Sequence, residues 1–155
     1  MKKIIFCIII FNAAIIGYSQ QLLVAVTDFT ASSGYTEEEL SNITELFAGF
    51  LRDTDRLRVV TRSQWEAILK EHSFQRGGLV AQTEIRELGK ALGAQAVITG
   101  TMMKLGNNNI LNLSLLDIES GEMVSGARKT FTSLDEFLDL LPTLASDVAR
   151  QVVRR

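Results

Sequence analysis

Few residues in this sequence have the chemistry of catalysis. His72 is the only histidine, so a Ser-His-Asp arrangement would have to use it. It follows Glu71 at the end of a short predicted helix, where we expect a partly exposed surface side chain. The only cysteine is Cys7, and one histidine with one cysteine cannot supply the usual ligands of a zinc ion.

The sequence also gives little support for a phosphate-binding loop or for a catalytic pair of carboxylates. Gly89-Lys90 has the Gly-Lys pair of a phosphate-binding loop, but it lies inside a predicted helix, where the backbone N–H groups are already bonded. Asp28 ends the first predicted strand, where open α/β sheets place ligands. Asp117 ends the fourth, and we expect it to shape the turn at 119–122. The sequence therefore predicts no catalytic residue, cofactor site or metal site.

The N-terminus has the pattern of an export signal. Lysines at 2–3 precede an apolar run at 4–16, and small residues at 17 and 19 mark a cleavage site before Gln20. The run is shorter than the roughly 20 residues that a membrane-spanning helix needs. We expect a signal peptide at 1–19 and one mature domain at 20–155; an uncleaved leader that serves as an anchor is the alternative.

Removal of the leader leaves a slightly acidic domain without cysteine. Loss of Lys2 and Lys3 takes the formal net charge from −2 to −4, and Cys7 is lost with them. Nucleic-acid binding needs clustered Lys and Arg to neutralise phosphates, so it is not expected. Disulfides and thiolate metal sites are excluded in the mature domain, whose stability must come from its core.

Apolar periodicity predicts an α/β domain. Strand-like runs occur at 22–26, 57–61, 96–101, 110–115 and 123–131. Helical spacing occurs at 36–52, 63–71, 83–93 and 133–152. The order βαβααβββα predicts a single three-layer-like domain with a mixed sheet of about five strands and a C-terminal helix. Strands joined by helices should pair in parallel, and the closing meander should add antiparallel strands.

Helix ends carry recognisable signals. Capping boxes are expected at three helix starts, Thr36–Glu39, Ser63–Glu66 and Ser133–Glu136, and Thr83 is expected to cap a fourth helix. Gly93 is expected to end that helix in the left-handed conformation.

Three further features of the helices carry predictions. Trp65 has helical spacing with apolar neighbours, which favours core packing over an interface role. Pro142 lacks an N–H and predicts a kink or a new helical piece. Arg150, Arg154 and Arg155 are expected to complement the negative C-terminal pole of the last helix, with attraction to anionic lipid or peptidoglycan as the alternative.

Several stretches taken together resemble a known family. They are VAVTDF (24–29), VVTR (59–62), ILKE (68–71), FQRGG (74–78), LGKALGAQAVITG (88–100) and LDIESGE (116–122). The series resembles the periplasmic domain of the curli secretion-channel family (CsgG), a fold shared with penicillin-binding-protein activators and similar to the TolB amino-terminal domain. The resemblance covers nearly all of the expected mature chain and implies a non-enzymatic envelope protein in the periplasm.

Two features depart from the family pattern. The curli channel inserts extra β-hairpins to line its pore, whereas every strand expected here belongs to the soluble fold, so no transmembrane pore is expected. Secretion and activator members are usually lipoproteins, and this chain lacks a lipobox cysteine. Association with the outer membrane is therefore left open.

The sequence as a whole predicts an exported, periplasmic protein-binding or assembly module, in secretion or in the regulation of cell-wall synthesis. The envelope partner is not identified, and the resemblance makes a homo-oligomer one option. The alternative is a small periplasmic ligand-binding protein or hydrolase. Partner contacts are assigned to two surface loops, because loops commonly carry binding residues: Ser33, Tyr35, Phe74, Arg76 and Leu79.

Overall fold

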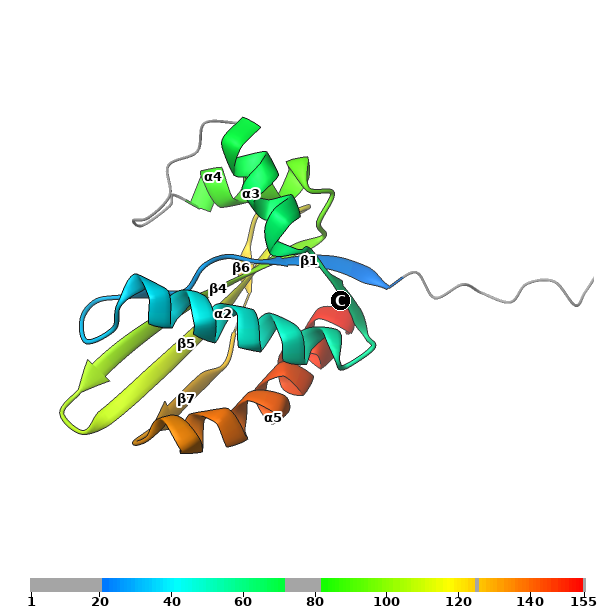
Figure 1. The fold of residues 1–155 in the computed structure, drawn as a ribbon. Coiled ribbons are helices and arrows are strands. Elements are labelled where there is room, and N and C mark those ends of the chain that lie inside the picture. Colours follow the sequence, from blue (N-terminus) through cyan, green and yellow to red (C-terminus); the bar gives the residue numbers. More distant parts are fainter. Residues whose placement is uncertain (1–20, 72–81, 125, 155) are drawn as a thin grey trace, which may run out of the picture.

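The computed structural model describes residues 21–71, 82–124 and 126–154, which fold around one mixed sheet (Figure 1). The strands in these ranges are β1 (Leu22–Val26), β2 (Thr30–Ala31), β3 (Leu57–Val59), β4 (Ala96–Leu105), β5 (Asn108–Asp117), β6 (Met123–Val124) and β7 (Arg128–Phe131). The helices are α2 (Glu37–Arg52), α3 (Arg62–Glu71), α4 (Gln82–Ala91) and α5 (Leu134–Val153). The predicted α/β class, with a mixed sheet and a C-terminal helix, is confirmed.

The sheet has a parallel half and an antiparallel half. Its order is β3-β1-β4-β5-β6, with β2 also paired to β4 and β7 to β5. β1 lies between β3 and β4 and is parallel to both, while β5 is antiparallel to β4, β6 and β7. β1 is apolar throughout because both of its faces are covered: Val24 and Ala25 point to opposite sides, and neither is exposed.

Helices cover both faces of the sheet, so the domain has three layers (Figure 1). α2 and α5 pack on one face, where the core includes Phe47 of α2 and Phe137 of α5. α3 and α4 pack on the other face, where Trp65 and Leu88 contact a second core cluster. Trp65 is 8% exposed, which confirms its predicted place in the core.

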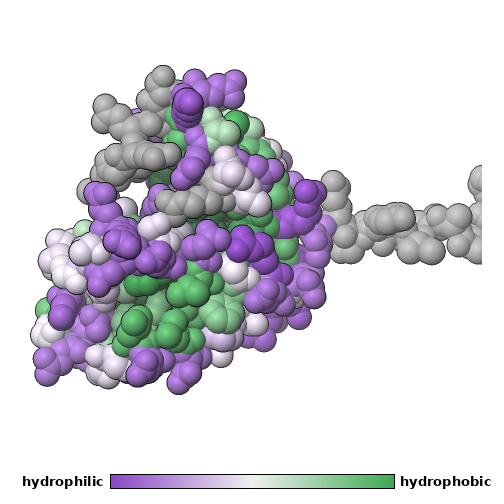
Figure 2. Space-filling view, in the orientation of Figure 1, coloured by the Kyte–Doolittle hydropathy of each residue, from purple (hydrophilic) through white to green (hydrophobic). Residues whose placement is uncertain are grey.

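Some apolar surface remains between the paired helices α2 and α5. Figure 2 shows an apolar area where these helices face each other, surrounded by hydrophilic residues. Leu46 of α2 and Leu134 and Leu138 of α5 are exposed large apolar residues on these helices. None of the helices in the described ranges is long and apolar enough to cross a bilayer.

The helix caps were predicted correctly in part. Thr36 and Glu39 form the expected capping box, and the N–H and hydroxyl of Thr36 hold the pKa of the Glu39 carboxyl below its usual value. Ser133 accepts from the N–H of Glu136, although the Glu136 carboxylate reaches back to Thr132.

Two predicted caps were wrong. α3 begins one residue before Ser63, and Thr61 caps it: the Thr61 N–H donates to Gln64, and the Gln64 N–H donates to the Thr61 hydroxyl. The box that forms is therefore Thr61–Gln64, because the strand before it ends earlier than its apolar residues indicate. α4 begins at Gln82, so Thr83 lies inside its first turn.

A glycine cap ends α4 as the sequence predicts. Gly93 has the left-handed φ of +68° that was predicted. Its N–H donates to the Lys90 carbonyl, and the Ala94 N–H donates to the Gly89 carbonyl, as in a Schellman motif.

Pro142 does not start a new helical piece, since α5 continues through it to Val153. Buried residues on both sides of Pro142 anchor the helix to the sheet: Phe137, Leu141, Leu144 and Ala145.

The predicted strand at 123–131 is divided by a β-bulge. Val124 is opposite Leu115 and Arg128 is opposite Asn112, so the outer chain has one residue more than β5 over this stretch. A Cβ on Gly126 would lie 1.4 Å from the Leu113 carbonyl oxygen, so the close approach of the two backbones requires glycine. The short strand β2, which the apolar periodicity did not predict, follows β1 and pairs with β4.

Two helical glycines give a matched test of this packing. A Cβ at Gly89 would lie 2.4 Å from Ile118 Cδ1 and 2.9 Å from Val97 Cγ2, whereas at Gly49 the nearest atom is 3.9 Å away. We expect Gly89→Ala to lower the free energy of unfolding by about 1–3 kcal/mol through overpacking. Gly49→Ala should raise it by about 0.5–1 kcal/mol, because alanine favours the helix. Urea unfolding measures both, and equal changes of the same sign would contradict this packing.

Candidate partner-binding surface

In the ranges that the structure describes, the second helical layer covers only part of the sheet. α3 and α4 have 10 residues each, about 15 Å of helix, while the 10 residues of β4 extend about 33 Å. Figure 1 shows β4 and β5 continuing well beyond these two helices. α2 and α5 have 16 and 20 residues, about 24 and 30 Å, and match the length of the strands on the other face.

The burial of every second side chain along β4 shows where the cover by α3 and α4 ends. Val97 is buried in the cluster with α4, and Thr99, two residues on, is half-buried. Thr101, Met103 and Leu105 follow on the same face and are exposed, Leu105 to 68%. No described helix covers this half of the sheet face, and Thr101, Met103 and Leu105 are exposed there.

Strand register determines which other residues share this surface. Thr30 is opposite Thr101, and the remaining cross-strand neighbours come from β5 and β7. We call the whole set the open sheet face: Thr30, Thr101, Met103, Leu105, Ile110, Asn112, Arg128 and Thr130. Arg128 is the only charged residue among these eight.

Hydrogen bonds join the polar members of the open sheet face. The Arg128 Nε donates to Asn112 Oδ1 at 2.6 Å, which orients both side chains. The hydroxyls of Thr30 and Thr101 lie 3.4 Å apart, and the Asn112 amide lies 3.7 Å from the Met103 sulfur. The result is an ordered surface with amide, hydroxyl and guanidinium groups beside three apolar side chains, an arrangement suited to binding.

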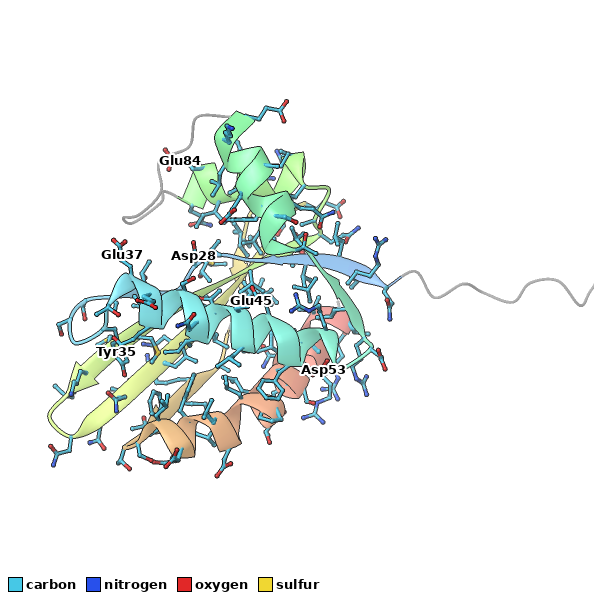
Figure 3. All side chains as sticks on the ribbon, viewed as in Figure 1. Asp28, Tyr35, Glu37, Glu45, Asp53 and Glu84 are labelled. Atoms are coloured by element: carbon cyan, nitrogen blue, oxygen red, sulfur yellow. The ribbon has the colours of Figure 1, made fainter. Side chains whose placement is uncertain are left out.

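Two of the five predicted partner residues lie next to this end of the sheet. The Tyr35 hydroxyl donates to Asn109 Oδ1 at 2.7 Å and so ties the loop before α2 to β5 (Figure 3). Ser33 is exposed in the same loop, beside Gly34, whose position packs on the Lys104 side chain. The other three predicted residues, Phe74, Arg76 and Leu79, lie outside the described residues.

The environment of Tyr35 changes its acidity. Burial raises the pKa of the Tyr35 hydroxyl, and the nearby Glu39 carboxylate raises it further. Because the folded-state pKa is raised, this group's contribution to stability is present at neutral pH and is lost as the pH rises through that pKa.

The structure describes two of the residues considered for catalysis, and they lie at different levels of the sheet, because Asp117 is level with Val24 and Asp28 comes four residues later. Asp28 is exposed at the end of the first strand, and Asp117 accepts from the N–H and hydroxyl of Ser120 at 2.8 and 3.0 Å, as expected for a turn-forming role. His72 lies outside the described residues. In the ranges that the structure describes, no three His, Cys, Asp or Glu side chains form a group that could hold a metal ion.

Sequence reasoning missed the open sheet face because it ended the third long strand at 101. The signal was present in the next strand, where leucines at 111, 113 and 115 alternate with Asn112 and Ser114. Such alternation is typical of a strand with one covered and one solvated face. The alternation indicates which face of β5 is in contact with water. It does not indicate how far along that face α3 and α4 extend.

The described residues form a three-layer α/β domain, and the comparisons place the chain in a family. The chain belongs to the family described as the curli production assembly/transport component CsgG, whose model matches residues 13–112. The resemblance noted in the sequence is therefore confirmed. No curated protein sequence matches the chain.

Solved structures share this fold at low sequence identity. The LpoB C-terminal domain from Salmonella enterica is 13% identical with a TM-score of 0.60, over 76% of this chain and 87% of that domain. Lipoprotein GNA1162 from Neisseria meningitidis is 17% identical with a TM-score of 0.57, over 84% and 96%. TolB from Acinetobacter baumannii is 12% identical with a TM-score of 0.52, over 86% of this chain and 28% of TolB. Identities this low establish the fold alone.

A tyrosinate titration tests the contact at Tyr35. The chain has two tyrosines, so a Tyr18→Phe background isolates Tyr35. We expect its absorbance midpoint to lie above the usual tyrosine value, and Glu39→Gln to lower the midpoint only in part, because burial is the larger cause. Glu37→Gln is the matched control and should leave it unchanged. A midpoint at the usual value would show that Tyr35 is fully solvated.

Proposed function

We propose that this protein is an exported envelope protein that acts as a non-enzymatic binding or assembly module, with the open sheet face as its contact surface. The observation that carries the proposal is the ordered half-sheet left uncovered beyond α3 and α4, with Met103 and Leu105 exposed at its end. Membership of a family described by assembly and transport supports the same class of function.

The composition of the open sheet face is that of a protein interface. Interface cores are enriched in Met and Arg and depleted in Lys, Glu and Asp. The open sheet face contains Met103 and Arg128, and none of its eight residues is Lys, Glu or Asp. The strand ladder and the Arg128–Asn112 hydrogen bond already order the surface, so a partner need not supply the free energy for ordering it.

Site-specific photocrosslinking in the native envelope tests this surface. A photoreactive amino acid replaces Met103 in one variant and Asp139, exposed on α5, in the control. We expect a defined adduct from position 103 only, identified by mass spectrometry. The adduct should be lost when Thr101→Glu adds a carboxylate to the exposed surface. An adduct with a second copy of this chain would make the module a homo-oligomer.

Two results would contradict the open sheet face as the contact surface. One is the same set of adducts from positions 103 and 139, which would indicate unspecific collision. The other is an adduct from position 103 that persists unchanged when Thr101→Glu is present.

Export gives a separate prediction about the N-terminus. We expect the protein recovered from the envelope to begin at Gln20, because small residues at 17 and 19 fit the cleavage site. Ser19→Phe should block cleavage and leave residues 1–19 attached, whereas Ser19→Ala should be processed normally. Intact-mass measurement distinguishes the two forms. A wild-type mass that includes residues 1–19 would instead support the retained anchor.

A further inference from the structure

The outer edge of β7 offers backbone groups for pairing. Among the described strands only β5 pairs with β7. The Leu113 N–H donates to the Ala127 carbonyl at 2.8 Å, which shows that the backbone of Ala127 faces β5. Backbone direction alternates along an antiparallel strand, so the N–H and C=O groups of Arg128 and Thr130 face outward. Such an edge is a template for one more strand.

A basic groove runs beside this edge. It lies between the chain before and within β7 and the last turns of α5, and its lining residues are Gly126, Ala127, Arg128, Lys129, Asp147, Arg150, Gln151 and Arg154. Asp147 is the only carboxylate in the lining, and it already forms an ion pair with Arg150. The groove therefore has an excess of positive charge.

Lys129 and Arg154 approach the groove from different elements. Lys129 lies two residues before Phe131 on the same face of β7, and Phe131 packs on Phe137 of α5 with ring centroids 4.6 Å apart. Lys129 therefore lies on the α5 side of the sheet. The negative C-terminal end of the α5 dipole explains a cation at Arg154. It does not explain Lys129, because Lys129 lies on a strand.

We propose that the β7 edge and this groove bind an extended acidic segment of a partner protein. The main chain of the segment pairs with the outward N–H and C=O groups of Arg128 and Thr130, which extends the sheet by one strand. Side chains on an added strand alternate between faces, so every second residue of the segment lies on the α5 side. Carboxylates at these alternate positions contact Lys129 and Arg154.

This contact adjoins the open sheet face, because it uses the outward backbone groups of Arg128 and Thr130, and it adds a second binding site to the proposed module. The two are distinguishable because Lys129 and Arg154 are not members of the open sheet face. Loss of the acidic-segment contact leaves the photocrosslink at position 103 unaffected. Failure of the photocrosslink likewise leaves binding at the β7 edge intact.

Peptide binding to the full chain tests the proposal. The probe is a fluorescent peptide of glutamate–threonine repeats, compared with lysine–threonine repeats and with glutamate–proline repeats. Proline keeps the charge but cannot donate a strand hydrogen bond. We expect the glutamate–threonine peptide to bind at least about tenfold more tightly than either comparison, as measured by fluorescence anisotropy. It should also slow hydrogen exchange at the amides of Arg128 and Thr130.

Charge reversal locates the site. Lys129→Glu with Arg154→Glu should weaken binding of the glutamate–threonine peptide by at least about tenfold. The control reverses two exposed cations at the opposite edge of the sheet, Arg56→Glu with Arg58→Glu, and should have little effect. Arg154→Glu alone, at an exposed helix end, gives a smaller loss and does not disturb the core.

Three outcomes would overturn the proposal. Equal weakening by the two charge-reversed pairs would show general attraction to a basic protein surface. Equal binding of the glutamate–proline peptide would show an anion site without strand addition. Unchanged exchange at Arg128 and Thr130 in the presence of bound peptide would place the peptide elsewhere.

Discussion

The structure depends on the antiparallel ladder between β4 and β5. The register runs without interruption from Ala96 opposite Asp117 to Leu105 opposite Asn108. Each strand points alternate side chains to opposite faces, so the ladder supplies one wall of both core clusters. Ile98 and Leu115 face α2 and α5, while Val97 and Leu116 face α3 and α4. The other strands extend the sheet that this pair begins.

The different lengths of the two helical layers explain the surface of the domain. α2 and α5 cover the ladder on one side almost from end to end, whereas α3 and α4 end near its middle. The half that no described helix covers combines polar side chains with the exposed apolar side chains of Met103 and Leu105. The bulge at Gly126 then ends the pairing of β6 and directs β7 along the outer half of β5. A free face and a free edge therefore meet on the same strand, with Arg128 on the face and Lys129 toward α5.

Local sequence signals correctly predicted much of the fold. Thr36 with Glu39, Gly93 and the alternating leucines of β5 act over a few residues, and their physical effects are the same in any tertiary setting. Predictions failed where two signals of similar strength competed. Thr61 and Ser63 both have capping chemistry, and the end of β3 decided between them. The strand pattern at 123–131 did not reveal the bulge, because the steric conflict at Gly126 is with the backbone of Leu113 on another strand.

The candidate sites show the same division between local and distant information. The sequence by itself determined the α/β class, the helices with their apolar faces, the core position of Trp65 and the family resemblance. Only the tertiary structure decided which half of the sheet stays open and that Lys129 shares a groove with Arg150 and Arg154. The physical reason is that periodicity specifies which side of an element is buried. Which element covers that side, and over what length, depends on contacts between residues far apart in the chain.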